Sequence, residues 1–347
     1  MSAVRLQMQR GMAATRYARC LAAGAGDVSV AVAFARRNFG DAFIRAGEIA
    51  GGGFIDGGWG EELVLPADAQ ADFVAAVNET SVVGALMPGF RLIPMNTRTP
   101  AQTSRASAGF VGGGEPIPVS APSFDPVTLE RRKVGALVVI SKELATSSSP
   151  RADDVLRRDL IQAAAEAIDA AFLDPAQDEI ASVQPASVTY GVSPVPSTGD
   201  PSRDVAALIE DFPGDLSRAY WICSPITAAR MAQFRDAGGQ YAFPGLSVRG
   251  GDILGIPVVT SRAAPVDSEG DLLALIDPSG ICVADDGVEF AASTQAVVNQ
   301  NSTPTSESTL VSLFQADAVG VKVIRPINWQ TARPAVSWTW ASYPASS

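Results

Sequence analysis

The spacing of apolar and polar positions predicts one long helix over residues 150–173. Ser149 is a good N-cap, Pro150 suits the first helical position, and Pro175 ends the pattern. One stripe of the helix is formed by Leu156, Leu160, Ala163, Ala167 and Ala171. At 1.5 Å per residue the helix would be about 36 Å long, and we interpret it as a scaffold element of the core.

The remaining pattern predicts shorter helices alternating irregularly with short strands. We expect helices around 13–23, 28–38, 66–80, 201–212 and 224–236. Apolar runs predict strands at 134–140, 219–223, 255–261, 272–277, 281–293 and 310–325, the first of them buried. Because helices and strands do not alternate regularly, the order indicates an α+β fold rather than a doubly wound parallel sheet.

Residues 91–132 follow neither periodicity. They contain six prolines and many serines and threonines, with hardly any packed apolar pattern. Their two ends, 91–99 and 124–134, allow extended strands, which predicts a hairpin that leaves the body of the protein. Such a hairpin has little core of its own and needs another surface to lie on. The segment therefore favours oligomerisation.

The charge distribution argues against a protein that reads nucleic acid. The 347-residue chain has a formal net charge of −11, whereas a nucleic-acid reader needs a basic surface. Only residues 1–60 are basic, with seven arginines and four acidic residues. We interpret this segment as an extended arm outside the core; a disordered tail is an equally good interpretation. Its charge suits an acidic neighbouring subunit, weak and non-specific contact with DNA, or a solvated face.

Several absences lower the expectation of an enzyme. The chain has no histidine, which removes the commonest general base and most zinc ligand sets, and it lacks a phosphate-binding loop. We therefore expect no catalytic residue, no cofactor and no metal. The acidic cluster that an α+β enzyme would use is Asp285, Asp286 and Glu289, but this stretch reads better as a turn between two strands.

Cysteine content and hydropathy indicate where the chain is made. Cys20, Cys223 and Cys282 match neither a disulfide framework nor a metal site, so synthesis in a reducing cytoplasm is expected. No signal peptide is recognisable. The apolar run at 134–140 is far below the roughly 20 residues that a membrane-spanning helix needs, and we expect no membrane contact.

These motifs, in this order, resemble the major capsid proteins of tailed phages and prophages with the Hong Kong 97-type fold. The resemblance covers roughly residues 75–340 and rests on five segments: 86–104 with 109–144, 148–174, 217–231, 251–261, and 275–340. It implies a spine helix at 150–173, an N-terminal arm at 1–60 and an extension loop at 91–132. It also implies an axial domain at 185–310 and a peripheral domain built from 61–90, 133–184 and 311–347.

The resemblance implies a structural subunit that self-assembles into pentamers and hexamers of an icosahedral virion shell around double-stranded DNA, built in the bacterial host cytoplasm. Portal, scaffolding or protease proteins are the further partners that it implies. An encapsulin-like nanocompartment shell is the alternative within the fold, and a soluble α+β enzyme is the rival outside it. The predicted contact residues of the extension loop are Arg98, Arg105, Phe110, Glu115 and Phe124.

The chain departs from the family at the tip of this loop. Relatives often have Trp-Val-Gly-Glu-Gly followed by Lys-Pro, where this chain has Phe110, Val111 and three glycines, then Ile117 and Pro118. Some relatives join subunits by an isopeptide bond from a loop lysine. This chain has no lysine within 91–132, so the resemblance implies a non-covalent shell here.

Overall fold

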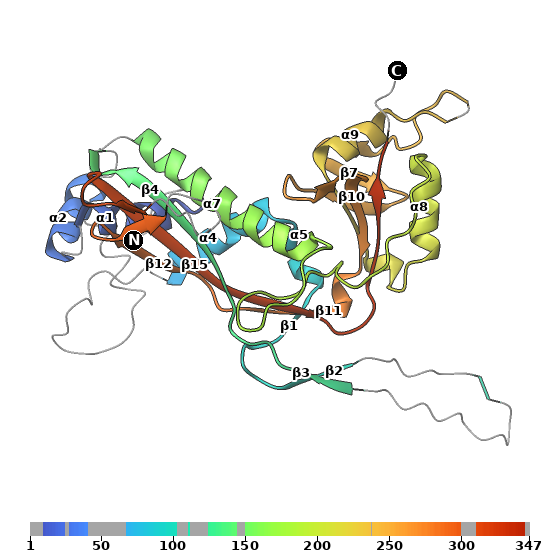
Figure 1. The fold of residues 1–347 in the computed structure, drawn as a ribbon, viewed down its shortest axis with the longest axis horizontal. Helices are drawn as coiled ribbons and strands as arrows, with labels where there is room; N and C mark the ends of the chain where they lie inside the picture. The colour runs from blue at the N-terminus through green and yellow to red at the C-terminus, as the bar shows by residue number, and fades with distance from the viewer. Residues whose placement is uncertain are drawn as a thin grey trace, which may run out of the picture. The chain divides into compact units, whose positions relative to one another are not determined.

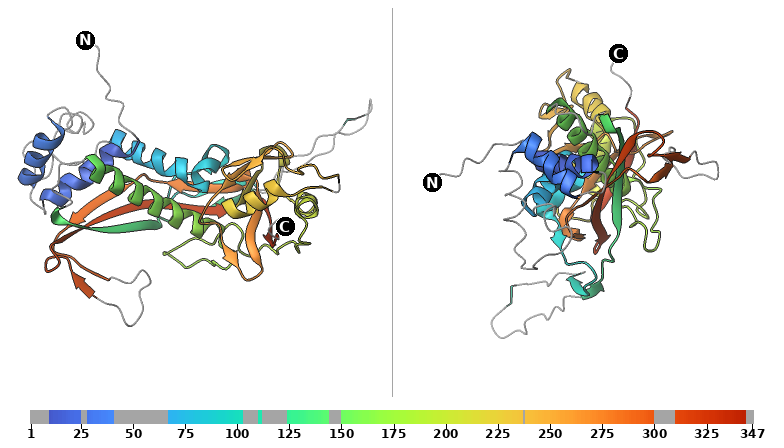
Figure 2. Two further views of the ribbon diagram at one scale, coloured as in Figure 1. Left: turned by 90° about the horizontal axis from the view of Figure 1, so that it is seen from above. Right: turned by 90° about the vertical axis from the view of Figure 1, so that its left-hand side faces the viewer.

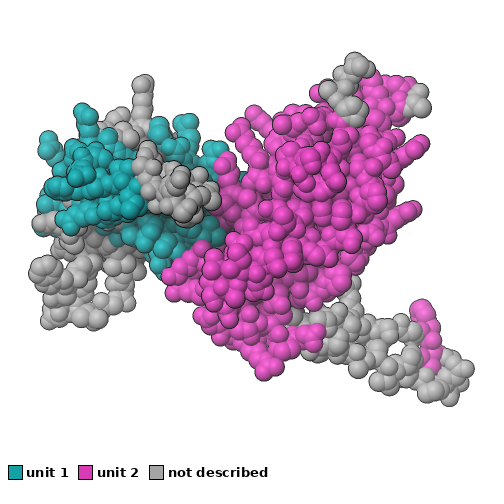
Figure 3. Space-filling view, in the orientation of Figure 1, with its two compact units in different colours: residues 1–80, 134–165, 287–325 teal, residues 81–133, 166–286, 326–347 magenta. Residues whose placement is uncertain are grey.

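The computed structural model describes residues 10–24, 28–40, 67–102, 110–111, 124–143, 150–236, 238–299 and 310–343. The chain divides into two compact units (Figure 3), which take alternating stretches of the sequence. Unit 1 comprises 1–80, 134–165 and 287–325, and unit 2 comprises 81–133, 166–286 and 326–347. The helix α7 (Pro150–Leu173) and the strand β15 (Ala318–Thr331) each continue from one unit into the other.

Unit 2 contains a mixed sheet with the strand order β16-β10-β5-β8-β7-β6, and β9 pairs with β10. Its strands are β5 (Tyr220–Cys223), β6 (Leu246–Ser247), β7 (Gly250–Ile253), β8 (Ile256–Thr260), β9 (Val266–Asp267), β10 (Gly270–Ile276) and β16 (Val336–Ala341). β5 and β8 are parallel, and the other pairs are antiparallel. The apolar residues of β10 are fully buried, because the strand lies in the middle of the sheet with both faces covered.

Helices α8 (Pro201–Glu210) and α9 (Pro225–Gln233) pack on this sheet (Figure 1). Both begin where the sequence predicts. Asp200 caps α8 by accepting from the Ser202 backbone N–H, and Ser224 caps α9 by accepting from the Thr227 N–H at 3.0 Å. A proline occupies the first turn of each helix.

A second set of pairings involves β15. In unit 2, β1 (Arg91–Leu92) runs parallel to β11 (Ile281–Asp285), and β11 pairs with residues 327–331 of β15. In unit 1, β12 (Glu289–Ser293) pairs with residues 320–324 of β15. β4 (Lys133–Ser141) also pairs with β15, and β13 (Val297–Asn299) pairs with β14 (Leu310–Ser312).

The C-terminal strand corrects part of the predicted domain division. We predicted residues 311–347 to belong to the peripheral domain and 185–310 to the axial domain. β16 instead pairs with β10 from Asp271↔Ala341 to Ile276↔Val336, so residues 336–341 share a sheet with residues predicted as axial. An apolar strand pattern predicts a strand but not its partner, which here lies far away in the sequence.

The N-terminal helices correct the predicted arm. α1 (Met12–Gly24) and α2 (Val28–Phe39) form where helices are predicted, but α1 packs against α2, α4 (Ala67–Thr80) and β12 within unit 1 (Figure 2). Ala14, Ala18 and Ala22 of α1 are buried, and Cys20 packs with Ala31 and Ala35. Residues 12–24 are therefore core rather than an extended arm; residues 41–60 lie outside the described residues.

The buried face of α7 differs from the predicted stripe. Leu160 is buried as expected, but Ala163 and Ala167 are exposed, and the Leu156 side chain lies outside the described residues. The buried face consists of Leu160, Ile161, Ala164, Ala165, Ile168, Asp169, Phe172 and Leu173. Large apolar side chains gain more from burial than alanines, so Ile161, Ile168 and Phe172 determine which face packs.

Candidate assembly interface

The structure contains a hairpin within residues 91–132, but it is shorter than predicted and lies further along the chain, because residues 91–92 pair with β11 instead. β2 (Thr99–Gln102) pairs antiparallel with β3 (Phe124–Val127), in the register Thr99↔Val127 to Gln102↔Phe124 (Figure 1). Pro100 and Pro126 face each other across the pair and supply no backbone N–H to it. Among the described residues neither strand has another strand beside it. A two-stranded hairpin is at best marginally stable by itself, so a covering surface would stabilise it.

The base of the hairpin is firmly anchored in unit 2. Ile93, Val127 and Leu129 form a buried cluster with two residues of β11, Cys282 and Ala284. The Ile93 N–H donates to the Val283 carbonyl at 2.9 Å, and the Asn96 N–H donates to the Leu129 carbonyl at 2.8 Å. The Asn328 side chain donates to the Glu130 carbonyl at 2.8 Å. Packing and hydrogen bonds therefore hold the two ends of the hairpin in unit 2.

Arg132 adds a buried cation to this base. Its side chain is 7% exposed, and its guanidinium donates to the Gln184 carbonyl and to the Glu179 carboxylate. The Arg132 carbonyl accepts from the Ile327 N–H at 3.1 Å, which ties the same residue to β15. A paired and hydrogen-bonded buried guanidinium is costly to disrupt, since its removal leaves unsatisfied partners.

The structure describes only some of the five predicted contact residues of the loop. Arg98 is exposed immediately before β2, and Phe110 is fully exposed. Phe124 begins β3, although its side chain lies outside the described residues, and so do Arg105 and Glu115 entirely. Their role in subunit contacts remains a prediction.

Unit 1 presents exposed apolar side chains that sequence reasoning missed. The strand β4 was predicted to be buried, but only Ile140 is, whereas Leu137 and Val139 are 52% and 46% exposed. Val297 and Leu310 of the β13–β14 pair and the nearby Phe314 are exposed as well. A continuous apolar run is typical of a strand that is covered on both faces. The uncovered face of β4 thus fits contact with a further chain.

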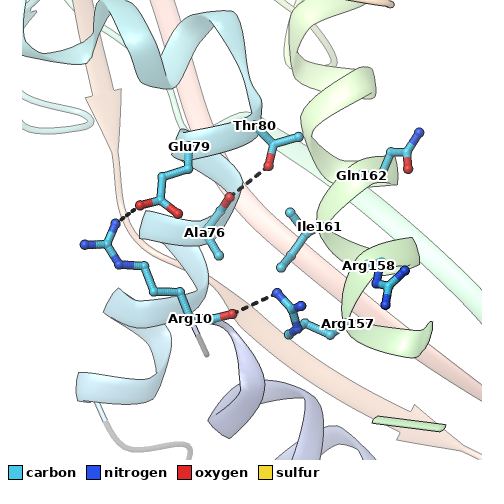
Figure 4. A pocket seen from close by; sticks show the side chains of 8 residues that line it. All are labelled: Arg10, Ala76, Glu79, Thr80, Arg157, Arg158, Ile161 and Gln162. Carbon is cyan, nitrogen blue, oxygen red and sulfur yellow. Dashed lines mark hydrogen bonds and ion pairs between the residues drawn. The ribbon is translucent and has the colours of Figure 1, made fainter. Parts of the chain in front are cut away.

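The cavity in Figure 4 lies within unit 1, between the start of α1 and the helices α4 and α7. It has a volume of about 530 Å³, and Arg10 pairs across it with Glu79. The Arg157 guanidinium donates to the Arg10 carbonyl at 3.2 Å, and the Gly11 N–H donates to Asp72 at 2.6 Å. These bonds hold the start of α1 against α4 and α7. The polar residues that line the cavity therefore stabilise the fold of unit 1.

Asp169 is a buried carboxylate on α7, and its burial was not predicted from the pattern of apolar positions. It is 1% exposed and accepts from the Val82 N–H at 3.0 Å and from the Ser261 hydroxyl at 2.9 Å. It thereby joins α7 to the start of α5 (Val82–Leu86) and to the segment after β8. Burial raises the pKa of Asp169 above the ordinary aspartate value of 3.8, outweighing the hydrogen bonds that lower it.

Substituting Asp169 tests this network. Asp169→Ala leaves the Val82 N–H and the Ser261 hydroxyl without an acceptor, and we expect it to lower the free energy of unfolding by about 2–3 kcal/mol. Because the folded state raises the pKa, wild-type stability falls as pH rises from the ordinary aspartate pKa through the raised one. The wild-type advantage over Asp169→Asn should therefore be larger at about pH 4.5 than at about pH 7.

Urea unfolding at the two pH values measures both effects. Asp159→Ala changes an exposed carboxylate on the same helix and should leave the unfolding midpoint unchanged. An Asp169→Ala variant as stable as Asp159→Ala would show that the network contributes nothing to the fold.

The suspected enzyme cluster forms a connection between strands. β11 ends at Asp285, Gly287 has a φ of +86°, and β12 begins at Glu289. No group of three or more cysteine or acidic side chains among the described residues is arranged to hold a metal ion. None of the described helices is long and apolar enough to cross a membrane.

Comparisons with known proteins agree with this architecture. The model of the phage capsid family matches residues 61–334. The capsid polyprotein of Pseudomonas phage PAJU2 is 32% identical over 353 residues, covering 94% of this chain and 53% of that protein. The chain thus spans about half the length of this relative.

Solved structures share the fold. Proteins of Mycobacterium phage Bobi and Gordonia phage Cozz each match with a TM-score of 0.50, at 14% and 16% identity. The matches cover 75% and 76% of this chain and 90% and 87% of those chains. The predicted fold class, α+β of the Hong Kong 97 type, is confirmed. Since the family model matches most of the chain and the fold agrees with it, the chain belongs to the phage capsid family.

Proposed function

We propose that this chain is the shell-forming subunit of a phage capsid, and that it assembles with copies of itself into the pentamers and hexamers of a closed icosahedral shell around double-stranded DNA. The observation that carries the proposal is the β2–β3 hairpin of a capsid-family chain, whose two strands have no further strand beside them among the described residues. In a ring of identical subunits each hairpin would lie on the next copy, and the exposed face of β4 would be covered in the same way.

The finer assignments belong to the same proposal. Residues 91–132 act as the extension loop, with Arg98, Arg105, Phe110, Glu115 and Phe124 in contact with a neighbouring copy. Residues 185–286, with β16 added, form the axial domain, because the remainder of the predicted range, 287–310, lies in unit 1. Portal, scaffolding or protease proteins are further partners, packaged DNA is contacted weakly, and the shell is assembled in the host cytoplasm as part of the virion.

Expression of the chain followed by electron microscopy of the purified particles tests the proposal. We expect closed, uniform shells. A chain that stays monomeric at every concentration and ionic strength tested would contradict the assembly function.

Boiling the particles in detergent tests how the shell is held together. Lys133 lies at the base of the loop, Lys142 is 4.0 Å from Asp317, and Lys322 lies in β15. Since no lysine lies within 91–132, we expect a single band near 36 kDa. Reductant-resistant covalent oligomers would refute the non-covalent shell.

A further inference from the structure

A second cavity, in unit 2, is rimmed by arginines from three distant parts of the chain. It has a volume of about 400 Å³, and its lining includes Arg91 of β1, Arg218 and Arg333. Asp215 is its one acidic lining residue among the described residues. In a chain with a net charge of −11, this is a local excess of positive charge.

Close backbone approaches bring these arginines together. A Cβ on Gly214 would lie 2.7 Å from the Asp277 Cβ, so glycine lets the segment that carries Arg218 pass close to Asp277. A Cβ on Gly280 would lie 2.6 Å from the Ala335 Cβ. The Gly280 carbonyl also accepts from the Arg333 N–H at 3.3 Å, which places Arg333 at the cavity.

The fold leaves much of this positive charge uncompensated. Arg218 is exposed, and its guanidinium makes no hydrogen bond or ion pair with any described residue. The Arg91 guanidinium donates to the Pro100 carbonyl at 2.8 Å, which is a neutral acceptor.

Arg333 shares the nearest buried carboxylate with other hydrogen-bond donors. It donates to the Ser279 hydroxyl at 2.6 Å and lies 3.7 Å from Asp277. Asp277 is 1% exposed and already accepts from the Ser279 N–H and hydroxyl and from the Asp215 N–H. In the Figure 4 cavity, by contrast, Arg10 is paired directly with Glu79.

We propose that the cavity rimmed by Arg91, Arg218 and Arg333 binds carboxylate side chains of a second copy of this chain. Guanidinium groups bind carboxylates through paired hydrogen bonds. Copies that each carry −11 repel one another as they approach, so a cationic cavity facing an acidic surface lowers that barrier. This inference rests on the proposed self-assembly.

Charge reversal at the rim tests the inference. Arg218→Glu should leave the melting temperature of the unassembled subunit unchanged, because the side chain is exposed and unpaired among the described residues. It should slow assembly, followed by light scattering at about 0.05 M salt, by about tenfold or more. The difference from wild type should shrink at about 0.5 M salt. Arg249→Glu, an equal charge change at another exposed arginine of unit 2, should assemble at nearly the wild-type rate.

Four outcomes overturn the inference. Shells forming equally fast from wild type and Arg218→Glu would refute it while leaving the proposed function intact. An equal effect of Arg249→Glu would assign the slowing to net charge. Inorganic phosphate could stabilise wild type but not Arg218→Glu, or a DNA duplex could bind wild type but not Arg218→Glu. Either result, with the same assembly rate for both proteins, would assign the cavity to that ligand. Wild type forming no shells would refute the proposed function and this inference with it.

Discussion

Replacing residues 100–126 by an Asn-Gly turn should give a folded subunit that no longer forms closed shells. Thr99 and Val127 are paired across the hairpin, so a two-residue turn can join them. The cluster of Ile93, Val127, Leu129, Cys282 and Ala284 that anchors the base is retained. Folding should persist because all five residues of that cluster lie outside the replaced segment, whereas assembly loses the segment that would lie on the next copy.

Circular dichroism, sedimentation and negative-stain microscopy measure the two properties separately. We expect a melting temperature within a few degrees of wild type, which corresponds to a change of about 1 kcal/mol at most in the free energy of unfolding. Complete shells should be lost. The matched control inserts the same turn in place of residues 300–309, since Asn299 and Leu310 are also paired. This control should still assemble. Complete particles from the 100–126 replacement would show that the hairpin is not an assembly clamp.

Local signals predicted the starts of helices well. α8 and α9 begin at capping residues followed by proline, and these signals act within one turn of the chain. The hairpin was predictable because prolines and polar residues separate two extended ends. Proline chemistry and hydrogen-bonded caps depend on neighbours in sequence, so sequence alone reports them.

Packing partners were less predictable. Ala163 and Ala167 fit a helical stripe, yet Ile161, Ile168 and Phe172 occupy the core, because the two faces of an alanine-rich helix differ little in sequence. Asp169 in the middle of the apolar face was the signal of a buried polar network. The partner of β16 depends on contacts far away in sequence. The same holds for the rim of Arg91, Arg218 and Arg333, which no spacing rule brings together.

The packing of the N-terminal helices was misjudged because the basic charge of residues 1–60 suggested an arm outside the core. The informative signal was the spacing of Ala14, Ala18 and Ala22, four residues apart, which forms a small-residue face on α1. Small side chains allow helices and strands to approach closely. α1 uses this face to pack within unit 1, where Ala14 is 0% exposed.

Ala14→Asp should therefore destabilise the subunit strongly. The new carboxylate would be buried where the methyl group of Ala14 packs, in a site that has not evolved to compensate a negative charge. We expect a loss of about 3–5 kcal/mol in the free energy of unfolding. Ala33→Asp places the same charge on an exposed position of α2 and should change stability by about 0.5 kcal/mol or less. Urea unfolding followed by circular dichroism compares the two. If Ala14→Asp unfolds at the same midpoint as Ala33→Asp, α1 does not belong to the core, and the N-terminal segment behaves as the detachable arm that its charge and glycine content suggest.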